Sequence, residues 1–271
     1  MSKLFSVKNK NIIISGGTGV LGKAIAVHLA KEGANMIILG RNPLKVEELV
    51  SEIKRAGFSA YAAVADVTDE SELQNLQEIL AKDFGSIDVL INAAGGNMPG
   101  AIVTPDQTIS DLSGSDVKKI LDLNYMGTFL PIKAFLPLMK AEKKGSIINI
   151  SSMAASRPMT RVMGYASAKA AVDNLTKWLA IEFSKKYGPG MRVNAVAPGF
   201  FLTEQNRQLL TQEDGSLTSR GNQIIGHTPM NRFGDPEDLF GTVQWLCSDA
   251  SKFITGTIVP VDGGFSAFSG V

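Results

Sequence analysis

Residues 11–22 read NIIISGGTGVLG, a short apolar run that leads directly into a glycine-rich loop. The run at 11–15 is rich in β-branched residues and too short for a typical helix, so it predicts a buried strand. A helical pattern follows Gly22 and continues to about Lys31. Glycine allows a tight turn and a close approach of the backbone to a ligand, and a helix start offers free N–H groups to a phosphate. The order strand, glycine loop, helix therefore predicts a dinucleotide site.

Apolar runs and amphipathic stretches alternate along the rest of the chain. Further strands are expected at 35–39, 60–64, 87–91, 145–150, 192–197 and 256–261, and helices at about 43–55, 69–83, 115–140, 164–187 and 236–248. The strands have almost no polar alternation, which is typical of a parallel sheet that is covered on both faces. We therefore expect one domain, residues 1–271, with an α/β doubly wound parallel sheet (a Rossmann fold) of about seven strands and helices on both faces.

Composition narrows the classes of function. The 271 residues are 44% hydrophobic, and 27 Lys and Arg nearly balance 26 Asp and Glu, so a nucleic-acid-binding surface is not expected. One cysteine, Cys247, and two histidines exclude multi-cysteine and histidine-rich metal sites, and no metal is expected. No stretch approaches the roughly 18 apolar residues of a membrane span, and the run at 11–15 is too short for a signal-peptide core. We expect a cytoplasmic protein without a membrane partner.

Two connections are unusually long for a chain of this kind. Residues 96–114 follow the fourth expected strand, and residues 198–235 follow the sixth. Both begin at the carboxyl ends of strands, where open α/β sheets bind their ligands. Long loops inside a compact domain are commonly functional, so we expect these two to border a substrate.

Tyr165 and Lys169 stand in the string YASAK, which opens the helix expected after the fifth strand. Residues i and i+4 share one face of a helix, so the tyrosine hydroxyl and the ammonium can converge on one point. The spacing alone proves little, but its position in the fold adds weight. Ser152 lies thirteen residues earlier at the end of INISS, and Asn124 lies in LNYMGT within the preceding helix.

Taken together, these motifs make the chain similar to the short-chain dehydrogenases/reductases over essentially its whole length. The matching motifs are SGGTGVLG at 15–22, Asp66 in ADV, NAAG at 92–95, Asn124, Ser152, the pair Tyr165 and Lys169, and Pro198-Gly199. One departure is that Val20 stands where the family's loop has glycine, while Gly19 precedes it, and Ser15 replaces the usual threonine. This departure concerns the detailed contacts with the phosphates and not the class of cofactor.

The resemblance implies a catalytic role for four residues. Tyr165 is expected to protonate the carbonyl oxygen during reduction, Ser152 to hold that oxygen, and Asn124 to keep a water in a proton relay. A free tyrosine titrates near 10, so work near pH 7 needs its pKa lowered by roughly three units, or about 4 kcal/mol. An ammonium about 4 Å away supplies about that much at an effective dielectric near 20, which is the role expected of Lys169. Lys169 is also expected to bond the nicotinamide ribose.

The resemblance also implies a set of cofactor-binding residues. Asp66 is expected to contact the adenine, Asn92 to position the cofactor, and Phe201 (by its backbone) and Thr203 to meet the carboxamide. The whole set is Gly16, Gly17, Thr18, Gly19, Val20, Leu21, Gly22, Arg41, Asp66, Val67, Asn92, Ala93, Ala94, Gly95, Pro198, Gly199, Phe201 and Thr203. A carboxylate after the second strand would bind an adenosine ribose, but this chain has Arg41, which can pair with a 2′-phosphate. NADP(H) is therefore the preferred cofactor, with NAD(H) as the alternative.

The segments that border the expected substrate pocket carry cations and amides beside Met and Phe. They are Asn97, Arg157, Arg161, Gln205, Asn206 and Arg207. A carboxylate favours an arginine partner, and sugar hydroxyls favour amides, so the expected substrate is a small sugar acid.

Three longer strings sharpen this expectation. NAAGGNMPGA, PGFFLTEQNR and PVDGGFSAFSGV resemble the branch of D-mannonate oxidoreductases, also named fructuronate reductases, which interconvert D-fructuronate and D-mannonate. Another sugar-acid or polyol dehydrogenase, a 3-oxoacyl-acyl carrier protein reductase, and a non-catalytic NAD(P)-sensing protein are the alternatives. The resemblance also implies a homotetramer that pairs the helices expected at 115–140 and 164–187.

Overall fold

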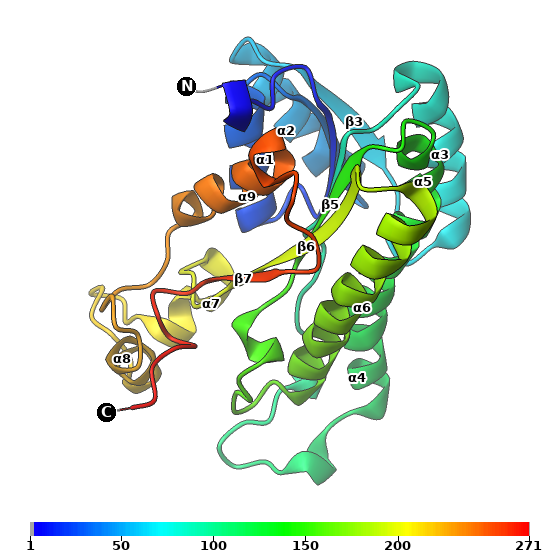
Figure 1. The fold of residues 1–271 in the computed structure, drawn as a ribbon. Helices are drawn as coiled ribbons and strands as arrows, with labels where there is room; N and C mark the ends of the chain where they lie inside the picture. Colours follow the sequence, from blue (N-terminus) through cyan, green and yellow to red (C-terminus); the bar gives the residue numbers. More distant parts are fainter. Residues whose placement is uncertain (1–2, 271) are drawn as a thin grey trace.

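A parallel sheet runs through the centre of the molecule (Figure 1). The computed structural model describes residues 3–270, apart from the side chains of Glu204 and Gln205. Within that part of the chain, seven strands are paired in the order β3-β2-β1-β4-β5-β6-β7. They are β1 Asn11–Ser15, β2 Asn35–Gly40, β3 Ala60–Val64, β4 Val89–Asn92, β5 Gly145–Ile150, β6 Met191–Pro198 and β7 Ile258–Val261. The chain winds outward from β1 to β3 and then from β4 to β7, which confirms the expected doubly wound sheet.

Helices cover both faces of the sheet (Figure 1). One face carries α1 Val20–Lys31, α2 Pro43–Arg55 and α9 Phe240–Cys247, and the other carries α3 Glu70–Phe84, α5 Gly127–Lys140 and α6 Met163–Tyr187. Of three further helices, α4 Gly114–Leu121 follows the first long connection, and α7 Glu204–Leu210 and α8 Ser219–Gly226 lie in the second. Short 3₁₀ turns are η1 Lys3–Phe5, η2 Pro99–Ala101, η3 Ile109–Asp111, η5 Met153–Ala155, η6 Pro236–Leu239 and η7 Asp249–Ser251, and η4 Asp122–Met126 is a π-helical turn. None of the helices described is long and apolar enough to cross a membrane.

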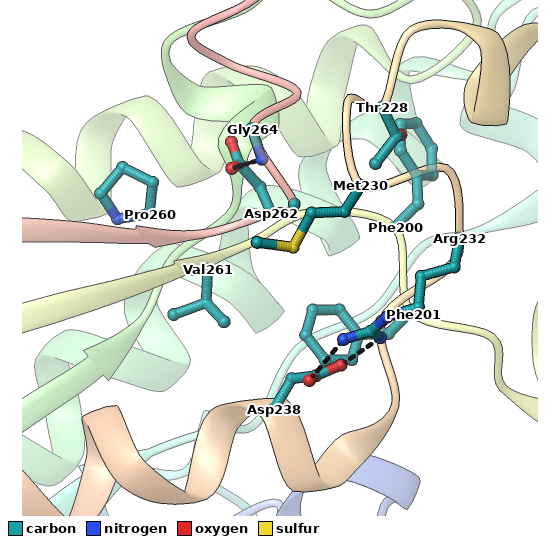
Figure 2. A pocket seen from close by; sticks show the side chains of 12 residues that line it. Phe200, Phe201, Thr228, Met230, Arg232, Asp238, Pro260, Val261, Asp262 and Gly264 are labelled. Carbon is teal, nitrogen blue, oxygen red and sulfur yellow. Dashed lines mark hydrogen bonds and ion pairs between the residues drawn. The ribbon is translucent and has the colours of Figure 1, made fainter.

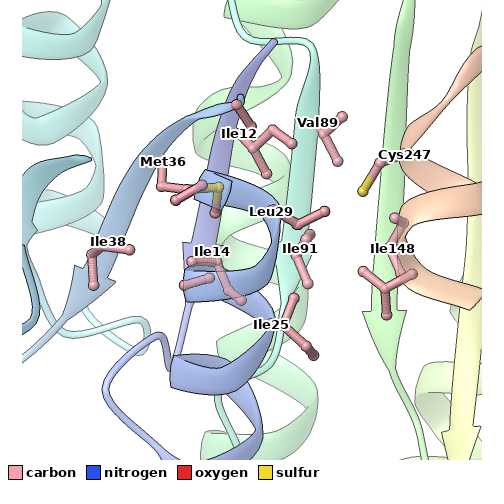
Figure 3. Close-up of a cluster of buried hydrophobic side chains, with 14 of the residues drawn as sticks. Ile12, Ile14, Ile25, Leu29, Met36, Ile38, Val89, Ile91, Ile148 and Cys247 are labelled. Carbon is pink, nitrogen blue, oxygen red and sulfur yellow. The ribbon is translucent and has the colours of Figure 1, made fainter. Parts of the chain in front are cut away.

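Alternate residues of each strand feed two separate apolar layers. Ile12 and Ile14 of β1 pack with Ile25 and Leu29 of α1 in the layer drawn in Figure 3, which Cys247 of α9 also joins. Ile13, between them, belongs to the layer under α3, α5 and α6. Burial of one such side chain contributes about 1.5–3 kcal/mol, so both faces of every central strand are selected to be apolar. This is why the strands lack polar alternation.

Two expectations about the elements are corrected by the structure. The helix expected at 115–140 is interrupted by the π-helical turn Asp122–Met126, in which Asn124 bonds the carbonyl of Ile120. The connection 198–235 is not loop throughout, because it contains α7 and α8. Thr218 caps α8 by accepting a hydrogen bond from the Gly221 N–H at 3.1 Å, and Ile224 is buried beneath it. A cap and one buried apolar face are sufficient for so short a helix when the rest of the fold supplies the packing.

Candidate active site

The glycine loop between β1 and α1 lies directly against the segment that follows β4. Gly16 has a φ of +64°, and a Cβ there would lie 2.6 Å from the Ala94 nitrogen and 2.7 Å from the Ala93 oxygen. A Cβ on Gly22 would lie 2.2 Å from the Gly16 carbonyl oxygen. Side chains at these positions would force the two segments apart. The loop therefore forms a cradle of bare backbone at the carboxyl edge of the sheet.

The start of α1 fits the pyrophosphate of a dinucleotide. Its N-cap, Gly19, provides no side-chain hydrogen bond, whereas the α2 N-cap Asn42 accepts from the Lys45 N–H and the α3 N-cap Asp69 accepts from two N–H groups. The first N–H groups of α1 thus lack a capping oxygen of the protein, and such groups with the helix dipole bind anions well. The helix begins at Val20 and not after Gly22, so Val20 and the two residues after it supply these groups.

Asn92, expected to position the cofactor, is tied into the interior instead of facing outward. Its side-chain Nδ2 donates to Asn149 Oδ1 at 2.9 Å, Asn149 Nδ2 donates to Thr176 Oγ1 at 2.9 Å, and Thr176 Oγ1 donates to the Val172 carbonyl at 2.8 Å. This chain of bonds fixes the ends of β4 and β5 against α6. Asn149 and Thr176 were not singled out from the sequence, because their partners are distant along the chain. Asn92 Oδ1 is buried and has no partner among the described residues.

Ser152, Tyr165 and Lys169 converge where β5 ends and α6 begins. Ser152 follows β5 and is the hydrogen-bond partner of the Tyr165 hydroxyl. Lys169 lies one turn further along α6, with Nζ 5.7 Å from the centre of the Tyr165 ring. Its ammonium donates to the Ile150 carbonyl at 2.7 Å, and the residue is only 3% exposed. The two side chains therefore lie on one face of α6, as the i, i+4 spacing predicts.

Burial moves the pKa values of both groups away from their ordinary values. It raises the pKa of Tyr165, which the hydrogen bond from Ser152 opposes, and it lowers the pKa of Lys169 to about 8, which Asp173 opposes. The expectation that Lys169 lowers the tyrosine pKa stays a prediction for the complex with cofactor and substrate. In the cofactor-free protein, the ammonium lies by the Tyr165 ring and bonds a main-chain carbonyl.

Asn124 joins the same group of residues through the π-helical turn. Its Nδ2 donates to the Gly96 carbonyl at 2.8 Å, and its Oδ1 accepts from the Gly96 N–H at 3.2 Å. A Cβ on Gly95 would lie 2.7 Å from Asn124 Oδ1 and 3.3 Å from Lys169 Nζ. Gly95 therefore lies between the two side chains, and all four expected catalytic residues share one end of the sheet.

The remaining expected cofactor residues lie around this edge. Arg41 is exposed just after β2, and the Asp66 carboxylate accepts from the Thr68 N–H and hydroxyl at 2.8 and 2.7 Å. Val67 is buried against Gly127. A Cβ on Gly199, which follows Pro198 at the end of β6, would lie 2.7 Å from Asp262 Cα, so this turn packs on the C-terminal segment.

Asn206 has a different role from the one expected. Its Nδ2 donates to the Phe201 carbonyl and its Oδ1 accepts from the Thr203 N–H, both at 2.8 Å. These are the residues expected to meet the cofactor carboxamide. Asn206 therefore orders this turn at the start of α7, and its amide is already satisfied by the protein.

The other expected substrate residues also differ in their freedom to bind. The Arg157 guanidinium donates to the Ser266 carbonyl of the C-terminal segment, which corrects its expected role, and Asn97 accepts from the Met98 N–H next to it. Arg207 is exposed on α7, and the side chain of Gln205 lies outside the described part of the structure.

The positive charge of Arg161 acts on that of a second arginine, Arg220, which the sequence did not indicate. The backbone of Arg161 has a φ of +76°, and its carbonyl accepts from the Val103 N–H of the other long connection at 2.9 Å. Arg220 on α8 is half-buried, and burial together with the positive charge of Arg161 lowers its pKa. The side chains of both arginines lack a hydrogen-bond or ion-pair partner among the described residues. No local motif around Arg220 could have indicated this pairing, because α8 is brought there by the fold.

A cavity of about 380 Å³ lies beside the segment that follows β6 (Figure 2). Phe200 and Phe201 line it together with the ends of β7, and Arg232 and Asp238 form a two-bond ion pair at 2.6 and 2.8 Å at its edge. None of the four expected catalytic residues lines this cavity. The cavity therefore borders Phe201 and the C-terminal segment and does not reach the four expected catalytic residues.

Known proteins match this chain over nearly its whole length. A family model described as enoyl-(acyl carrier protein) reductase matches residues 18–266. An uncharacterised oxidoreductase of Bacillus subtilis, UxuB, is 45% identical over 276 residues, which is 98% of each chain. A solved structure from Haemophilus influenzae with bound NAD, provisionally described as a D-mannonate oxidoreductase, has a TM-score of 0.91 and 40% identity over 98% of each chain. A gluconate 5-dehydrogenase from Burkholderia cenocepacia, solved with NADP and tartrate, has a TM-score of 0.87 and 29% identity, also over 98% of each chain.

Proposed function

The chain belongs to the short-chain dehydrogenase/reductase family of NAD(P)-dependent oxidoreductases, and from this premise we propose that its substrate is a small sugar acid. The preferred pair is D-fructuronate and D-mannonate, which differ by reduction of a carbonyl to a secondary alcohol. The likeness to the Haemophilus influenzae protein supports this choice.

The four residues at the carboxyl edge divide the work of carbonyl reduction. A bound nicotinamide supplies or accepts the hydride. Ser152 and Tyr165 share a hydrogen bond, so a carbonyl oxygen that replaces part of it is held between the two hydroxyls. Tyr165 then gives its proton to that oxygen, and the ammonium of Lys169 favours the tyrosinate that is left. Asn124 holds Gly96, and the neighbouring Gly95 lies beside Lys169, so the backbone at this edge keeps its shape.

The observation that carries the substrate class is the pair Arg161 and Arg220. Two guanidinium groups that have no carboxylate partner repel each other. The burial of Arg220 adds to the free-energy cost of keeping it charged. A substrate carboxylate between them would remove the repulsion and would form charge-assisted hydrogen bonds to both. A neutral ketone or an acyl chain would leave the pair uncompensated.

The cofactor preference and the assembly are part of the same proposal. Arg41 supports NADP(H), since it is exposed where a 2′-phosphate would emerge, while related structures hold NAD or NADP. We further propose a homotetramer, supported by the exposed apolar side chains of α6, and a cytoplasmic setting, supported by the buried free thiol of Cys247.

A substrate panel tests the proposal. Keto-aldonates, uronates, neutral ketoses and acetoacetyl thioesters are each assayed with NADH and NADPH. We expect turnover of the sugar acids, and a KM for the acid that rises roughly tenfold or more in Arg161→Ala and Arg220→Ala, because a hydrogen bond to a charged group contributes about 1.5–3 kcal/mol.

The matched control is Arg55→Ala, which removes an exposed arginine at the end of α2 and should leave KM within about twofold, as surface substitutions commonly do. Activity confined to thioesters or neutral ketones would refute the sugar-acid substrate. An equal rise of KM for acid and neutral ketose in both variants would place the carboxylate elsewhere.

A further inference from the structure

Two consecutive residues at the end of β5 each form a hydrogen bond with a residue of α6. Ile150 accepts a hydrogen bond from Lys169 Nζ at 2.7 Å, and the Ser151 hydroxyl donates to the carboxylate of Asp173. Lys169 and Asp173 are four residues apart in α6, so they lie on one face of the helix, one turn apart. The strand end therefore fixes an ammonium and a carboxylate one helical turn apart, beyond ion-pair distance.

The surroundings of Asp173 contain few other charges. The charged groups that act on it are Lys169 and Lys177, both on α6, and Ser151 is its hydrogen-bond donor from the strand. A cavity of about 210 Å³ adjoins Asp173, and apart from Lys177 its lining carries no charge. The uncharged lining residues are Met153, Ser156, Ala197, Ile258, Pro260 and Ser266. Asp173 is half-buried, so its field on Lys169 is only partly screened by water.

Lys169 depends on this carboxylate for its charge. Within the described residues, no carboxylate lies within ion-pair distance of its ammonium, and the hydrogen bond that holds it is to a main-chain carbonyl. Burial lowers the pKa of Lys169 to about 8, and Asp173 is the charge that opposes this lowering. The balance between the two decides how much of Lys169 is charged near neutral pH.

We propose that Asp173 is a positioning residue for the reaction, because its carboxylate, anchored by Ser151 one helical turn from Lys169, favours the ammonium form of Lys169 beside Tyr165. The inference rests on the roles proposed above for Tyr165 and Lys169. It concerns a proton equilibrium that is present without cofactor or substrate, so it can be tested apart from turnover.

The direct test is a titration of Lys169 in the cofactor-free protein. Lysine labelled with ¹³C at Cε is followed by NMR against pH, and the Lys169 signal is assigned by its loss in Lys169→Met. We expect a midpoint near pH 8 in the wild type. In Asp173→Asn the midpoint should fall by roughly one pH unit, because an opposite charge that favours the ammonium has been removed.

Two further variants make the result specific. Asp173→Glu keeps the charge and should restore a midpoint close to that of the wild type. Lys177→Gln changes the same face of α6 one turn further but keeps the carboxylate, so its midpoint should not fall. If Asp173→Asn does not fold, Asp173→Ser, which can still pair with Ser151, is measured in its place. An unchanged midpoint in the neutral variant overturns the proposal.

The pH profile of turnover gives the second readout. In the oxidative direction, Tyr165 must lose its proton and Lys169 must keep its own, so the alkaline limb of kcat reports Lys169. Asp173→Asn should move that limb to lower pH and leave the acid limb in place. A purely structural role would lower kcat equally at every pH, and that result would overturn the proposal. A shifted NMR midpoint in a protein that reduces no sugar acid would refute the proposed substrate and leave the role of Asp173 standing.

Discussion

Among single residues, Tyr165 is the proposed donor of the proton that reduction requires. Its hydroxyl interacts with that of Ser152, and burial raises its pKa. The hydroxyl is therefore protonated and ready to donate at neutral pH. We expect Tyr165→Phe to lower kcat by about 10²–10⁴-fold, the usual contribution of a positioned acid. Cofactor affinity, measured by NADPH fluorescence, should stay close to that of the wild type, since the hydroxyl acts in the chemical step.

The matched control for this change is Tyr61→Phe. It removes a hydroxyl from an exposed tyrosine of β3, far along the chain from the site. Turnover of that variant should be unchanged. Near wild-type turnover in Tyr165→Phe would instead remove Tyr165 from the proposed mechanism.

Arg41 is the residue that should decide between the two nicotinamide cofactors. NADP(H) differs from NAD(H) by a 2′-phosphate, and an exposed arginine after β2 can pair with it. We expect Arg41→Ala to weaken NADP(H) binding roughly tenfold or more and to leave NAD(H) binding nearly unchanged, because a hydrogen bond to a charged group contributes about 1.5–3 kcal/mol.

Dissociation constants for both cofactors, measured by calorimetry, check this prediction. Arg55→Ala, which removes an exposed arginine near the end of α2, is the control for a general loss of positive charge. Equal weakening of the two cofactors by Arg41→Ala would mean that Arg41 does not recognise the phosphate.

At the scale of elements, the loop between β1 and α1 needs glycine at position 22, because the backbone of Gly16 lies very close to it. A Cβ on Gly22 would lie 2.2 Å from the Gly16 oxygen, which is backbone and cannot move away alone. We expect Gly22→Ala to reshape the loop, and both cofactor affinity and Tm should fall.

The control is an exposed glycine of another helix, where a side chain has open space. A Cβ on Gly241 of α9 meets nothing within 4 Å, so Gly241→Ala should be neutral or slightly stabilising, since alanine favours a helix by about 0.5–1 kcal/mol. Calorimetric Tm values of both variants test this prediction. A Gly22→Ala protein with unchanged Tm and cofactor affinity would show that the close approach has no consequence.

For the whole molecule, the outer face of α6 remains apolar after both layers of the core are filled. Trp178 is 58% exposed and Ile181 is 60% exposed, one turn apart. Large exposed apolar side chains in contact with each other commonly mark an interface between subunits. We expect a homotetramer by light scattering, and a smaller assembly for the double variant Trp178→Glu/Ile181→Glu.

Ile79→Glu on α3 is the control, because that isoleucine is 54% exposed on another helix. Its mass should equal that of the wild type. A monomeric wild-type protein at micromolar concentration would contradict the proposed assembly, and an unchanged mass in the double variant would place the interface elsewhere.

The sequence alone determined the order of the elements and most of their bounds. The strand expected at 60–64 and the helix expected at 43–55 have the predicted limits in the structure, and most others differ by one or two residues. The exceptions are the helix expected at 115–140, which is divided, and the one expected at 236–248, whose α-helical part begins at Phe240. The reason is that strand length, helical periodicity and caps are local properties. The same is true of Tyr165 and Lys169, whose shared face follows from four residues of helix.

Which polar groups are free and which are already bound depends on the folded structure. The side chains of Arg157 and Asn206 are of types that can bind a sugar acid. In the structure, Arg157 already bonds Ser266, and Asn206 already bonds Phe201 and Thr203. Arg220 has no distinctive motif, and the charge of Arg161 acts on it only because folding brings α8 to Arg161. Asp173 is four residues from Lys169 in the same helix, and folding adds its hydrogen bond with Ser151 and the burial of Lys169. Burial and charge at a site are sums over residues distant in the chain, and no local pattern of the sequence contains those sums.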